Sequence, residues 1–148
     1  MSAVPPLSGD SIHASTVAIG GRAVLITGPS GSGKSDLALR LLDRGFALVS
    51  DDRTLVRREN DRLIASAPPQ IAGKMEVRGI GIVDVDHDPD VPVALLVELT
   101  GEIERLPDDG RERSVLGVRL PLVSIDAKTA SAPAKVALAL DRLGLKFQ

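Results

Sequence analysis

Short apolar runs separated by polar turns recur along the whole chain, and they predict many strands but only two helices. The runs at 16–19 and 23–26 flank Gly20 and Gly21, a pattern typical of a tight hairpin. Further strands are predicted at 46–49 and 91–99, and a second hairpin at 54–57 and 62–65 around the polar turn 59–61. Apolar positions spaced three or four apart predict helices over 35–44 and 134–143, which end at Gly45 and Gly144.

The intervening stretches are less regular. Residues 1–10, rich in Pro, Ser and Gly, are expected to be a flexible lead-in, and 70–75 a short helix. Glycines at 79 and 81 predict a loop that enters a strand at 80–85, followed by an acidic turn over 84–90. Residues 100–113 predict a solvated loop, and 115–125 one or two strands around Pro121. The fold class expected is an α/β domain with a mixed sheet, a single catalytic domain over 11–148.

The predicted strand at 23–26 leads directly into a phosphate-binding loop, the pattern Gly-x-x-x-x-Gly-Lys-Ser at 28–35. Glycines let successive backbone N–H groups approach phosphate oxygens, and the following helix directs its positive end at the same anion. Lys34 is expected to reach the β- and γ-phosphates, and the Ser35 hydroxyl to bind Mg²⁺. The residues predicted to bind ATP are Gly28, Pro29, Ser30, Gly31, Ser32, Gly33, Lys34 and Ser35.

Composition narrows the class of protein further. The chain has 148 residues, of which 43% are hydrophobic and 1% aromatic, so its core must consist of aliphatic residues. A net charge of −2 and the scarcity of aromatic rings argue against nucleic acid as a partner. Cys is absent, which excludes thiolate metal sites, and an apolar run of about 18 residues is also lacking. A cytoplasmic enzyme with no membrane partner is therefore expected.

Transfer of a phosphoryl group also needs a metal and a group that deprotonates the acceptor. Asp51 and Asp52 follow the strand after the loop helix, where open α/β sheets place their ligands, and Glu76 is a third candidate. Two adjacent carboxylates repel each other, which can raise the pKa of one of them and make it a better base. Asp51, Asp52 and Arg53 are also compatible with a simple capping turn, although the functional interpretation is favoured, and His13 and Arg105 on their own are typical of surface residues.

Taken together, several blocks resemble the catalytic domain of the bacterial HPr kinase/phosphorylase family, which acts on a serine of the phosphocarrier HPr. They comprise His13, the loop segment 25–35, Arg44 with Gly45, and the segments 49–53 and 67–69. The run Met-Glu-Val-Arg-Gly-Ile-Gly-Ile-Val-Asp-Val over 75–85 is more specific than the phosphate loop. The resemblance extends over about residues 11 to 128 and implies a phosphoenolpyruvate carboxykinase-like P-loop fold.

The resemblance also implies roles for individual residues. Asp52 matches the proton acceptor in phosphorylation, assisted by His13, and Arg105 matches a catalytic arginine near the phosphate. Ser35 and Glu76 match the two magnesium ligands, and Lys34 the lysine of the loop. The implied activity is an ATP- and Mg²⁺-dependent protein-serine kinase that regulates the phosphotransferase system. The implied partners are an HPr-like phosphocarrier as substrate and further copies of the chain in a homo-oligomer, often a hexamer.

The chain departs from the family pattern at its two ends. The core begins almost at once, as in the short proteobacterial forms that lack the N-terminal domain. Lys128 matches a lysine of the segment tied to dephosphorylation, but Thr129, Ala130 and Ser131 stand where the family often has Gly-Arg-Asn. Phosphorolysis of the phosphoserine therefore stays open. Two other hypotheses for the function of the loop also stay open: a P-loop kinase of a small-molecule acceptor and a non-catalytic nucleotide-binding switch.

Overall fold

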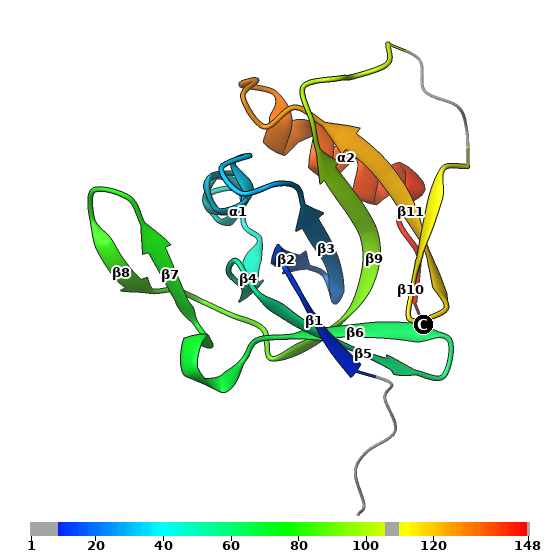
Figure 1. Ribbon diagram of the computed structural model, residues 1–148, viewed down its shortest axis with the longest axis horizontal. Coiled ribbons are helices and arrows are strands. Elements are labelled where there is room, and N and C mark those ends of the chain that lie inside the picture. Colours follow the sequence, from blue (N-terminus) through cyan, green and yellow to red (C-terminus); the bar gives the residue numbers. More distant parts are fainter. Residues whose placement is uncertain (1–8, 106–109, 148) are drawn as a thin grey trace, which may run out of the picture.

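A computed structural model describes residues 9–105 and 110–147. Its main element is a curved mixed sheet in which β1, β5, β6, β9, β3, β2 and β4 lie side by side in that order (Figure 1). β11 joins this sheet along β9, and β10 pairs with β11. The strands of the sheet are β1 (Gly9–Ile12), β2 (Ala14–Ile19), β3 (Arg22–Thr27), β4 (Ala47–Ser50), β5 (Thr54–Glu59), β6 (Arg62–Ser66), β9 (Asp90–Leu99), β10 (Glu112–Val115) and β11 (Val118–Ile125).

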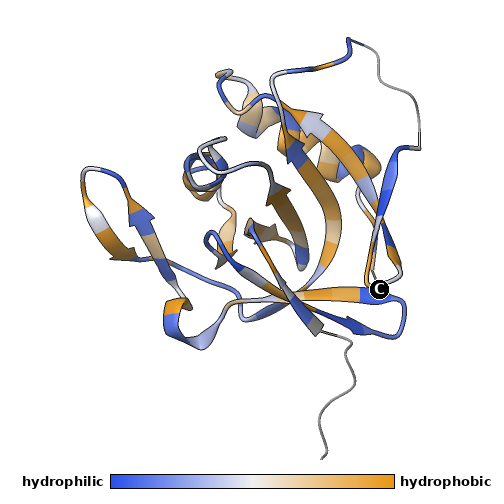
Figure 2. Ribbon diagram, in the orientation of Figure 1, coloured by the Kyte–Doolittle hydropathy of each residue, from blue (hydrophilic) through white to orange (hydrophobic). Residues whose placement is uncertain are grey.

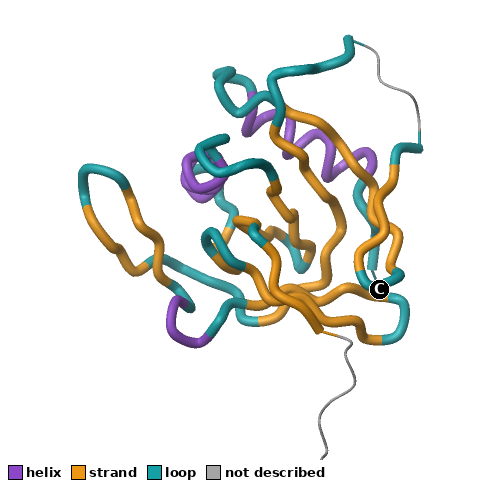
Figure 3. The backbone as a smooth tube through the Cα atoms, in the orientation of Figure 1, coloured by secondary structure: helices purple, strands orange, loops and turns teal. Residues whose placement is uncertain are grey.

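Two helices and a separate hairpin complete the fold. Helix α1 (Lys34–Leu42) follows β3, and α2 (Ala132–Leu143) follows β11. The hairpin of β7 (Lys74–Val77) and β8 (Gly81–Asp84) pairs only with itself and projects from the sheet, just after the short 3-10 helix η1 (Pro69–Ile71) (Figure 3). None of the helices in the described parts of the chain combines the length and the apolar character needed to cross a membrane.

Strand direction decides where the functional residues gather. β3, β9 and β11 are mutually parallel, and β2 is antiparallel both to β3 and to β4, so β4 runs in the same direction as β3. The carboxyl ends of β3, β4, β9 and β11 therefore meet at one edge of the sheet, where β2 begins. The segments that follow these strands, among them the phosphate loop, share that edge.

The predicted hairpin before the phosphate loop is confirmed. β2 and β3 pair in a register that places Ile19 opposite Arg22, with Gly20 and Gly21 as the two turn residues. Their φ angles of 59° and 76° are those of a type I′ turn, which glycine adopts without steric cost. The hairpin makes the strand before the loop antiparallel to its neighbour in sequence, which distinguishes this sheet from a plain doubly wound one.

Both faces of the central strands are buried, and Figure 2 shows the corresponding concentration of apolar residues in the middle of the sheet. On β3, Val24 and Ile26 belong to the cluster beneath α1 and α2, whereas Ala23 and Leu25 belong to the cluster on the opposite face. The second cluster is enclosed by residues of β5, β6, β10 and β11 as the sheet curls over itself. Burial on both faces explains why β3 and β9 are continuous apolar runs rather than alternating ones.

Several predictions of local structure were wrong. Residues 74–77 form strand β7 where a short helix and then a loop were expected, and only residues 69–71 are helical. The one or two strands expected around Pro121 are two, β10 and β11, and the turn between them lies at Leu116 and Gly117, so Pro121 lies within β11. Gly9 and Asp10 pair with β5, and Glu112 and Arg113 belong to β10. Residues 1–8 of the predicted lead-in and 106–109 of the predicted loop lie outside the described residues.

Candidate functional site

The segment 28–33 connects β3 to α1 as a tight loop at the carboxyl edge of the sheet. The amide of Ser32 donates to the carbonyl of Pro29 (3.0 Å), and Gly31 and Gly33 have φ angles of 80° and 98°. A Cβ at Gly28 would lie 2.7 Å from the Ser32 hydroxyl and 3.1 Å from Leu99 Cβ, so a larger residue fits there only if these neighbours shift. At Gly31 no atom lies within 4 Å of the position of an added Cβ, so the backbone there is open to an approaching ligand.

Lys34 is the first residue of α1, and its side chain folds back into the loop. Its ammonium donates to the carbonyl oxygens of Gly28 (2.9 Å) and Pro29 (3.2 Å), and the residue is only 8% exposed. An ammonium has three N–H donors, so these two bonds orient the group and leave a third donor for an anion. The Ser32 hydroxyl in the same loop is buried and has no hydrogen-bond partner within the described chain.

Asp51 is a buried member of this site that the sequence left among several candidates. Its Oδ1 accepts hydrogen bonds from the hydroxyls of Ser35 (2.7 Å) and Ser15 (3.0 Å), which come from α1 and β2. Asp51 thus links the phosphate loop to the neighbouring strands. The sequence signal for Asp51 was its position just after the apolar run 46–49, at the expected carboxyl end of a strand.

Asp52 adopts a different conformation from its neighbour. Its φ of 65° is unusual for a residue other than glycine and is tolerated better by Asp than by most others. The Ser15 hydroxyl accepts a hydrogen bond from its amide (3.0 Å), which fixes the turn while the side chain stays exposed. Residues held in sparsely populated regions of φ and ψ cluster at functional sites, which is consistent with a functional role for Asp52.

Glu76 reaches the same cleft from the separate hairpin. Met75 is buried against α1, whereas Glu76, the next residue on β7, is exposed. One cleft brings the loop, both aspartates and this part of the hairpin together; it is lined by Ser30, Gly31, Gly33, Lys34, Ser35, Asp36, Leu39, Asp51, Asp52, Met75, Glu76, Val77 and Arg78. The structure therefore gathers Lys34, Ser35, Asp52 and Glu76, as expected from the sequence.

Two predicted residues lie outside the lining of this cleft. His13 is exposed between β1 and β2, two residues before Ser15, so it belongs to the same edge of the sheet. Arg105 is exposed beyond the carboxyl end of β9, next to the residues that are not described. Neither side chain makes a hydrogen bond or ion pair to the described chain, and their roles remain predictions.

A second cleft opens on the other side of the phosphate loop, towards β9 and β11. It is lined by Thr27, Gly28, Pro29, Gly31, Ser32, Glu98, Leu99, Thr100, Gly101, Arg113, Asp126, Ala127 and Lys128. Arg113 Nη2 donates to Glu98 Oε2 (2.7 Å), and this hydrogen bond holds the pKa of Glu98 below its usual range. Glu98 and Arg113 are thus a paired acid and base, whereas the Lys128 side chain is exposed in the cleft.

The donor atoms of the first cleft fit a hard cation bound together with phosphate. Among the described residues no three His, Cys, Asp or Glu side chains gather as a metal site. Mg²⁺ in nucleotide sites is held by one or two protein oxygens and by the phosphates themselves. Ser35 with Asp51, and Glu76 across the cleft, supply such oxygens beside a loop whose open backbone at Gly31 and buried lysine suit a phosphate chain.

A phosphate loop between a parallel strand and a helix, with carboxylates after the adjacent strand, defines a P-loop domain built on a mixed sheet. The family model that describes the HPr serine kinase C-terminal domain matches residues 7–140. The chain belongs to this family. The family assignment confirms the expected fold class, with which a phosphoenolpyruvate carboxykinase-like topology is consistent.

Individual relatives agree with the family assignment. The HPr kinase/phosphorylase of Limosilactobacillus reuteri is 40% identical over 132 residues, which cover 80% of this chain and 41% of the relative. The enzyme of the same name from Lactiplantibacillus plantarum is 34% identical over 151 residues, covering 93% and 47%. The chain thus spans less than half the length of these two relatives. The solved Hpr(Ser) kinase/phosphatase from Coxiella burnetii superposes with a TM-score of 0.76 at 31% identity, covering 89% of this chain and 94% of that one.

Proposed function

We propose that this chain is an ATP- and Mg²⁺-dependent protein-serine kinase whose substrate is an HPr-like phosphocarrier. The observation that carries the proposal is the contact between the Ser35 hydroxyl and Asp51 (2.7 Å) in a cleft shared with Lys34, Asp52 and Glu76. Phosphoryl transfer requires a phosphate-binding loop, oxygen ligands for a cation and a base for the acceptor. Lys34 belongs to the loop, Ser35, Asp51 and Glu76 supply the oxygens, and Asp52 is the base.

In the proposed reaction the acceptor serine oxygen forms a bond to the γ-phosphorus as the bond from that phosphorus to the β,γ-bridging oxygen breaks. Asp52 takes the proton that the hydroxyl loses, and ADP is the leaving group. Asp52 suits this role because its side chain is exposed at the cleft while its backbone is fixed by Ser15. Lys34, anchored in the loop, stabilises the negative charge that spreads over the transferred group.

Ser35 and Glu76 are the residues we expect to hold Mg²⁺, and Asp51 is placed to orient the Ser35 hydroxyl or to join it. Bound Mg²⁺ would neutralise charge on the β- and γ-phosphates. Ordered amides at the start of α1 and the open backbone at Gly31 provide the contacts for the phosphate chain itself.

A protein acceptor is favoured by the exposed apolar residues of the hairpin beside the cleft. Glu76 lies directly opposite Ile82 in the β7–β8 hairpin, so the two side chains share one face of it. Ile82 is 72% exposed and Ile80 76%, which gives an apolar surface beside the expected site of reaction. A small-molecule kinase would be expected to enclose its acceptor instead. We further propose that the chain acts in the cytoplasm as a homo-oligomer.

The test is incubation of the chain with Mg²⁺, labelled ATP and the HPr-type protein of the same organism. Phosphoserine on the carrier is the expected product, and a panel of small alcohols and sugars serves as the competing set of acceptors. Turnover of ATP with a small acceptor but not with the carrier would contradict the proposal, as would the absence of phosphoserine when an established family member labels the same carrier. Addition of inorganic phosphate to the phosphorylated carrier then tests for phosphorolysis.

A further inference from the structure

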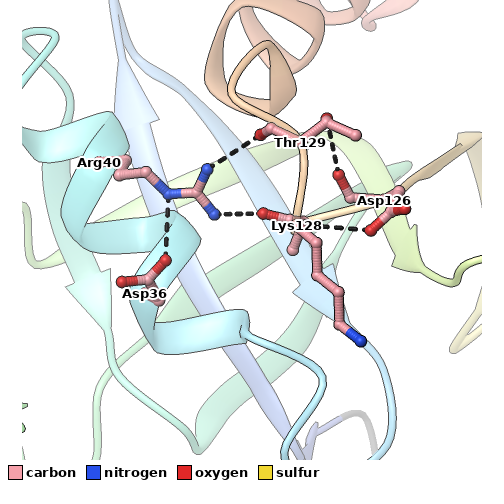
Figure 4. A network of polar contacts seen from close by, with 6 residues as sticks. Asp36, Arg40, Asp126, Lys128 and Thr129 are labelled. Atoms are coloured by element: carbon pink, nitrogen blue, oxygen red, sulfur yellow. Dashed lines mark hydrogen bonds and ion pairs between the residues drawn. The ribbon is translucent and has the colours of Figure 1, made fainter.

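The loop that connects β11 to α2 is tied to the phosphate-loop helix by one arginine. Arg40 of α1 donates from Nη1 to the carbonyl oxygen of Thr129 (3.2 Å) and from Nη2 to that of Ala127 (Figure 4). Its Nε lies 3.1 Å from Asp36 Oδ2 on the same helix, in an ion pair whose angle does not satisfy a hydrogen bond. A single guanidinium thus joins elements separated by almost ninety residues in sequence.

The same loop is ordered by its own polar contacts. Asp126 accepts a hydrogen bond at Oδ1 from the amide of Lys128 (2.9 Å), and its carbonyl accepts one from the Thr129 hydroxyl (3.1 Å). These bonds leave the Lys128 side chain exposed, and it extends away from Arg40 (Figure 4). The backbone on both sides of Lys128 is therefore fixed, one side by each nitrogen of the guanidinium fork.

The tethered loop also lies against the phosphate loop. A Cβ added to Gly33 would lie 3.2 Å from Cβ of Ala127, which is itself only 6% exposed. Lys128, the next residue, lines the second cleft together with Gly28, Gly31 and Ser32. Arg113 is the other cation in that lining, and its charge is already paired with Glu98. Lys128 is thus the cation of this cleft whose side chain is free to meet an anion held by the loop.

We propose that Arg40 is a positioning residue, which holds Lys128 at the open side of the phosphate loop so that Lys128 binds phosphate oxygens of the nucleotide. This inference rests on the proposed nucleotide binding and adds to it a second cation and the residue that places it. Because α1 begins at the phosphate loop, Arg40 makes the loop, its helix and the Lys128 segment move as one unit. Arginine suits this role because its rigid planar fork carries donors on two separate nitrogens, one for the carbonyl of Ala127 and one for that of Thr129, whereas a lysine at this position has a single nitrogen to reach both.

The test is a double-mutant cycle on the full chain, with the dissociation constant of Mg²⁺-ATP measured by isothermal titration calorimetry. We expect Arg40→Met and Lys128→Met each to weaken binding by about 5- to 10-fold, and the double variant to bind no more weakly than Lys128→Met alone. Non-additivity is the signature of one residue acting through the other. Arg44→Met, at an exposed arginine just beyond the same helix, is the matched control and is expected to bind ATP as the unaltered chain does.

The Arg40→Lys variant tests whether the weaker Mg²⁺-ATP binding of Arg40→Met only reflects misfolding. It keeps the charge beside Asp36, so we expect it to remain folded at the temperature of the binding measurement, with a single cooperative unfolding transition, and to show the same weakening as Arg40→Met. Losses that multiply in the double variant, or an Arg40→Met variant that binds normally, would overturn the role of Arg40. Failure of the unaltered chain to bind Mg²⁺-ATP would instead contradict the proposed function, so the two failures are distinguishable.

Discussion

At the scale of single residues, two adjacent aspartates with the same chemistry occupy opposite environments. Asp51 is buried and accepts two hydroxyl hydrogen bonds, whereas Asp52 is exposed in a left-handed turn at the cleft. The two hydroxyl donors fix the orientation of the Asp51 carboxylate, which suits an orienting or cation-binding role. The exposed carboxylate of Asp52 can reach a proton on an incoming hydroxyl. We therefore expect the two adjacent aspartates at 51–52 to have different functions.

This division predicts the effect of Asp52→Asn. An amide cannot accept the serine proton, so we expect kcat for phosphorylation of the carrier to fall about 10²- to 10⁴-fold. The dissociation constant of ATP should stay the same, because the loop and Lys34 are untouched. Steady-state kinetics together with calorimetry measure both quantities, with Asp43→Asn, at an exposed aspartate after α1, as the control. Retention of full activity by Asp52→Asn would remove Asp52 from the mechanism and would favour a nucleotide-binding switch.

Asp51→Asn should act on the cation instead. The carbonyl oxygen of asparagine can still accept both hydroxyl hydrogen bonds, but the side chain lacks the negative charge that favours Mg²⁺ beside Ser35. We expect the Mg²⁺ concentration at half-maximal activity to rise about 10- to 100-fold, with a smaller change in kcat at saturating Mg²⁺. A magnesium titration of activity measures this shift, and Asp86→Asn, at an exposed position outside the cleft, is the control. An unchanged magnesium requirement would show that Asp51 only braces the fold.

Most residues of the candidate site could be predicted from the sequence, because the phosphate loop and the segment around Glu76 are each contiguous motifs. The choice between Asp51 and Asp52 was less accessible. It depends on Ser15, a residue of β2 that reaches Asp51 and the amide of Asp52 only through the pairing of β2 with β4. A hydrogen bond across 36 residues leaves no trace in local spacing.

At the scale of elements, the end of α2 depends on an arginine from the hairpin before the phosphate loop. Arg22 donates to the carbonyl oxygens of Leu140 (2.8 Å), in the last turn of the helix, and of Leu145 (2.9 Å), just beyond its end. Charge-assisted bonds of this kind contribute about 1.5–3 kcal/mol. The segment after α2 is thereby held against the sheet, where the amide of Leu145 also donates to Ala94 (2.9 Å).

We therefore expect Arg22→Met to lower the free energy of unfolding by about 1–3 kcal/mol without changing the dissociation constant of ATP. Urea denaturation monitored by circular dichroism measures the loss. Arg119→Met is the matched control, because Arg119 is exposed and its side chain makes no hydrogen bond or ion pair within the described part of the chain. Equal stability of both variants would contradict a capping role for Arg22.

The pair formed by Glu98 and Arg113 ties the end of β9 to β10 and makes a prediction about pH. Because Arg113 lowers the native pKa of Glu98, the folded state binds this proton less readily than the unfolded state does. The stabilisation is therefore complete above the ordinary carboxyl pKa and is lost as the pH falls through the native value. Both side chains are partly exposed, so screening limits the contribution to about 0.2–1 kcal/mol.

Accordingly, Glu98→Gln should be less stable than the unaltered chain near neutral pH, and the two should become equal in acid. Urea denaturation at a series of pH values measures this convergence. Glu112→Gln, at an exposed residue of β10, provides the comparison. A stability difference between Glu98→Gln and the unaltered chain that persists unchanged in acid would show that packing, and not the ion pair, is the cause.

Elements with a strong periodic signal were predicted well, and those whose structure depends on a partner were not. The β2–β3 hairpin, α1 and α2 followed from the turn glycines and the helical spacing. Strand β7 was missed because only alternate residues are buried and because its partner β8 begins with glycine. The division between β10 and β11 was left open as one or two strands around Pro121, because proline is a strong local signal, although it is tolerated here within β11 and the turn lies at Leu116 and Gly117.

At the scale of the whole molecule, strand order creates the site. The phosphate loop, Asp51 with Asp52, and Lys128 follow three strands that are far apart in sequence but run in the same direction. Their shared edge could be anticipated for the loop and the aspartates from the general behaviour of open sheets. The contribution of β11 could not, because its parallel pairing with β9 depends on the curl of the whole sheet and not on any local pattern.

The projecting hairpin gives the last prediction, which rests on the proposed protein acceptor. Met75 and Val83 face the core, so Ile82 shares the opposite face with Glu76 and extends the proposed site outward. Burial of an isoleucine against a partner contributes about 1.5–3 kcal/mol, and every 1.4 kcal/mol is a factor of ten. Ile82→Ser should therefore raise KM for the phosphocarrier about 10-fold or more, while the dissociation constant of ATP stays the same.

Steady-state kinetics with varied carrier concentration measure the effect. Ile19→Ser is the matched control, because Ile19 is 40% exposed at the β2–β3 turn, at the opposite end of these strands from the phosphate loop. Light scattering separates the two partners that such an apolar face can have. An unchanged mass with a raised KM supports docking of the carrier, because the defect then appears only when the acceptor binds. A reduced mass would show that Ile82 joins copies of the chain, and the carrier would have to dock elsewhere.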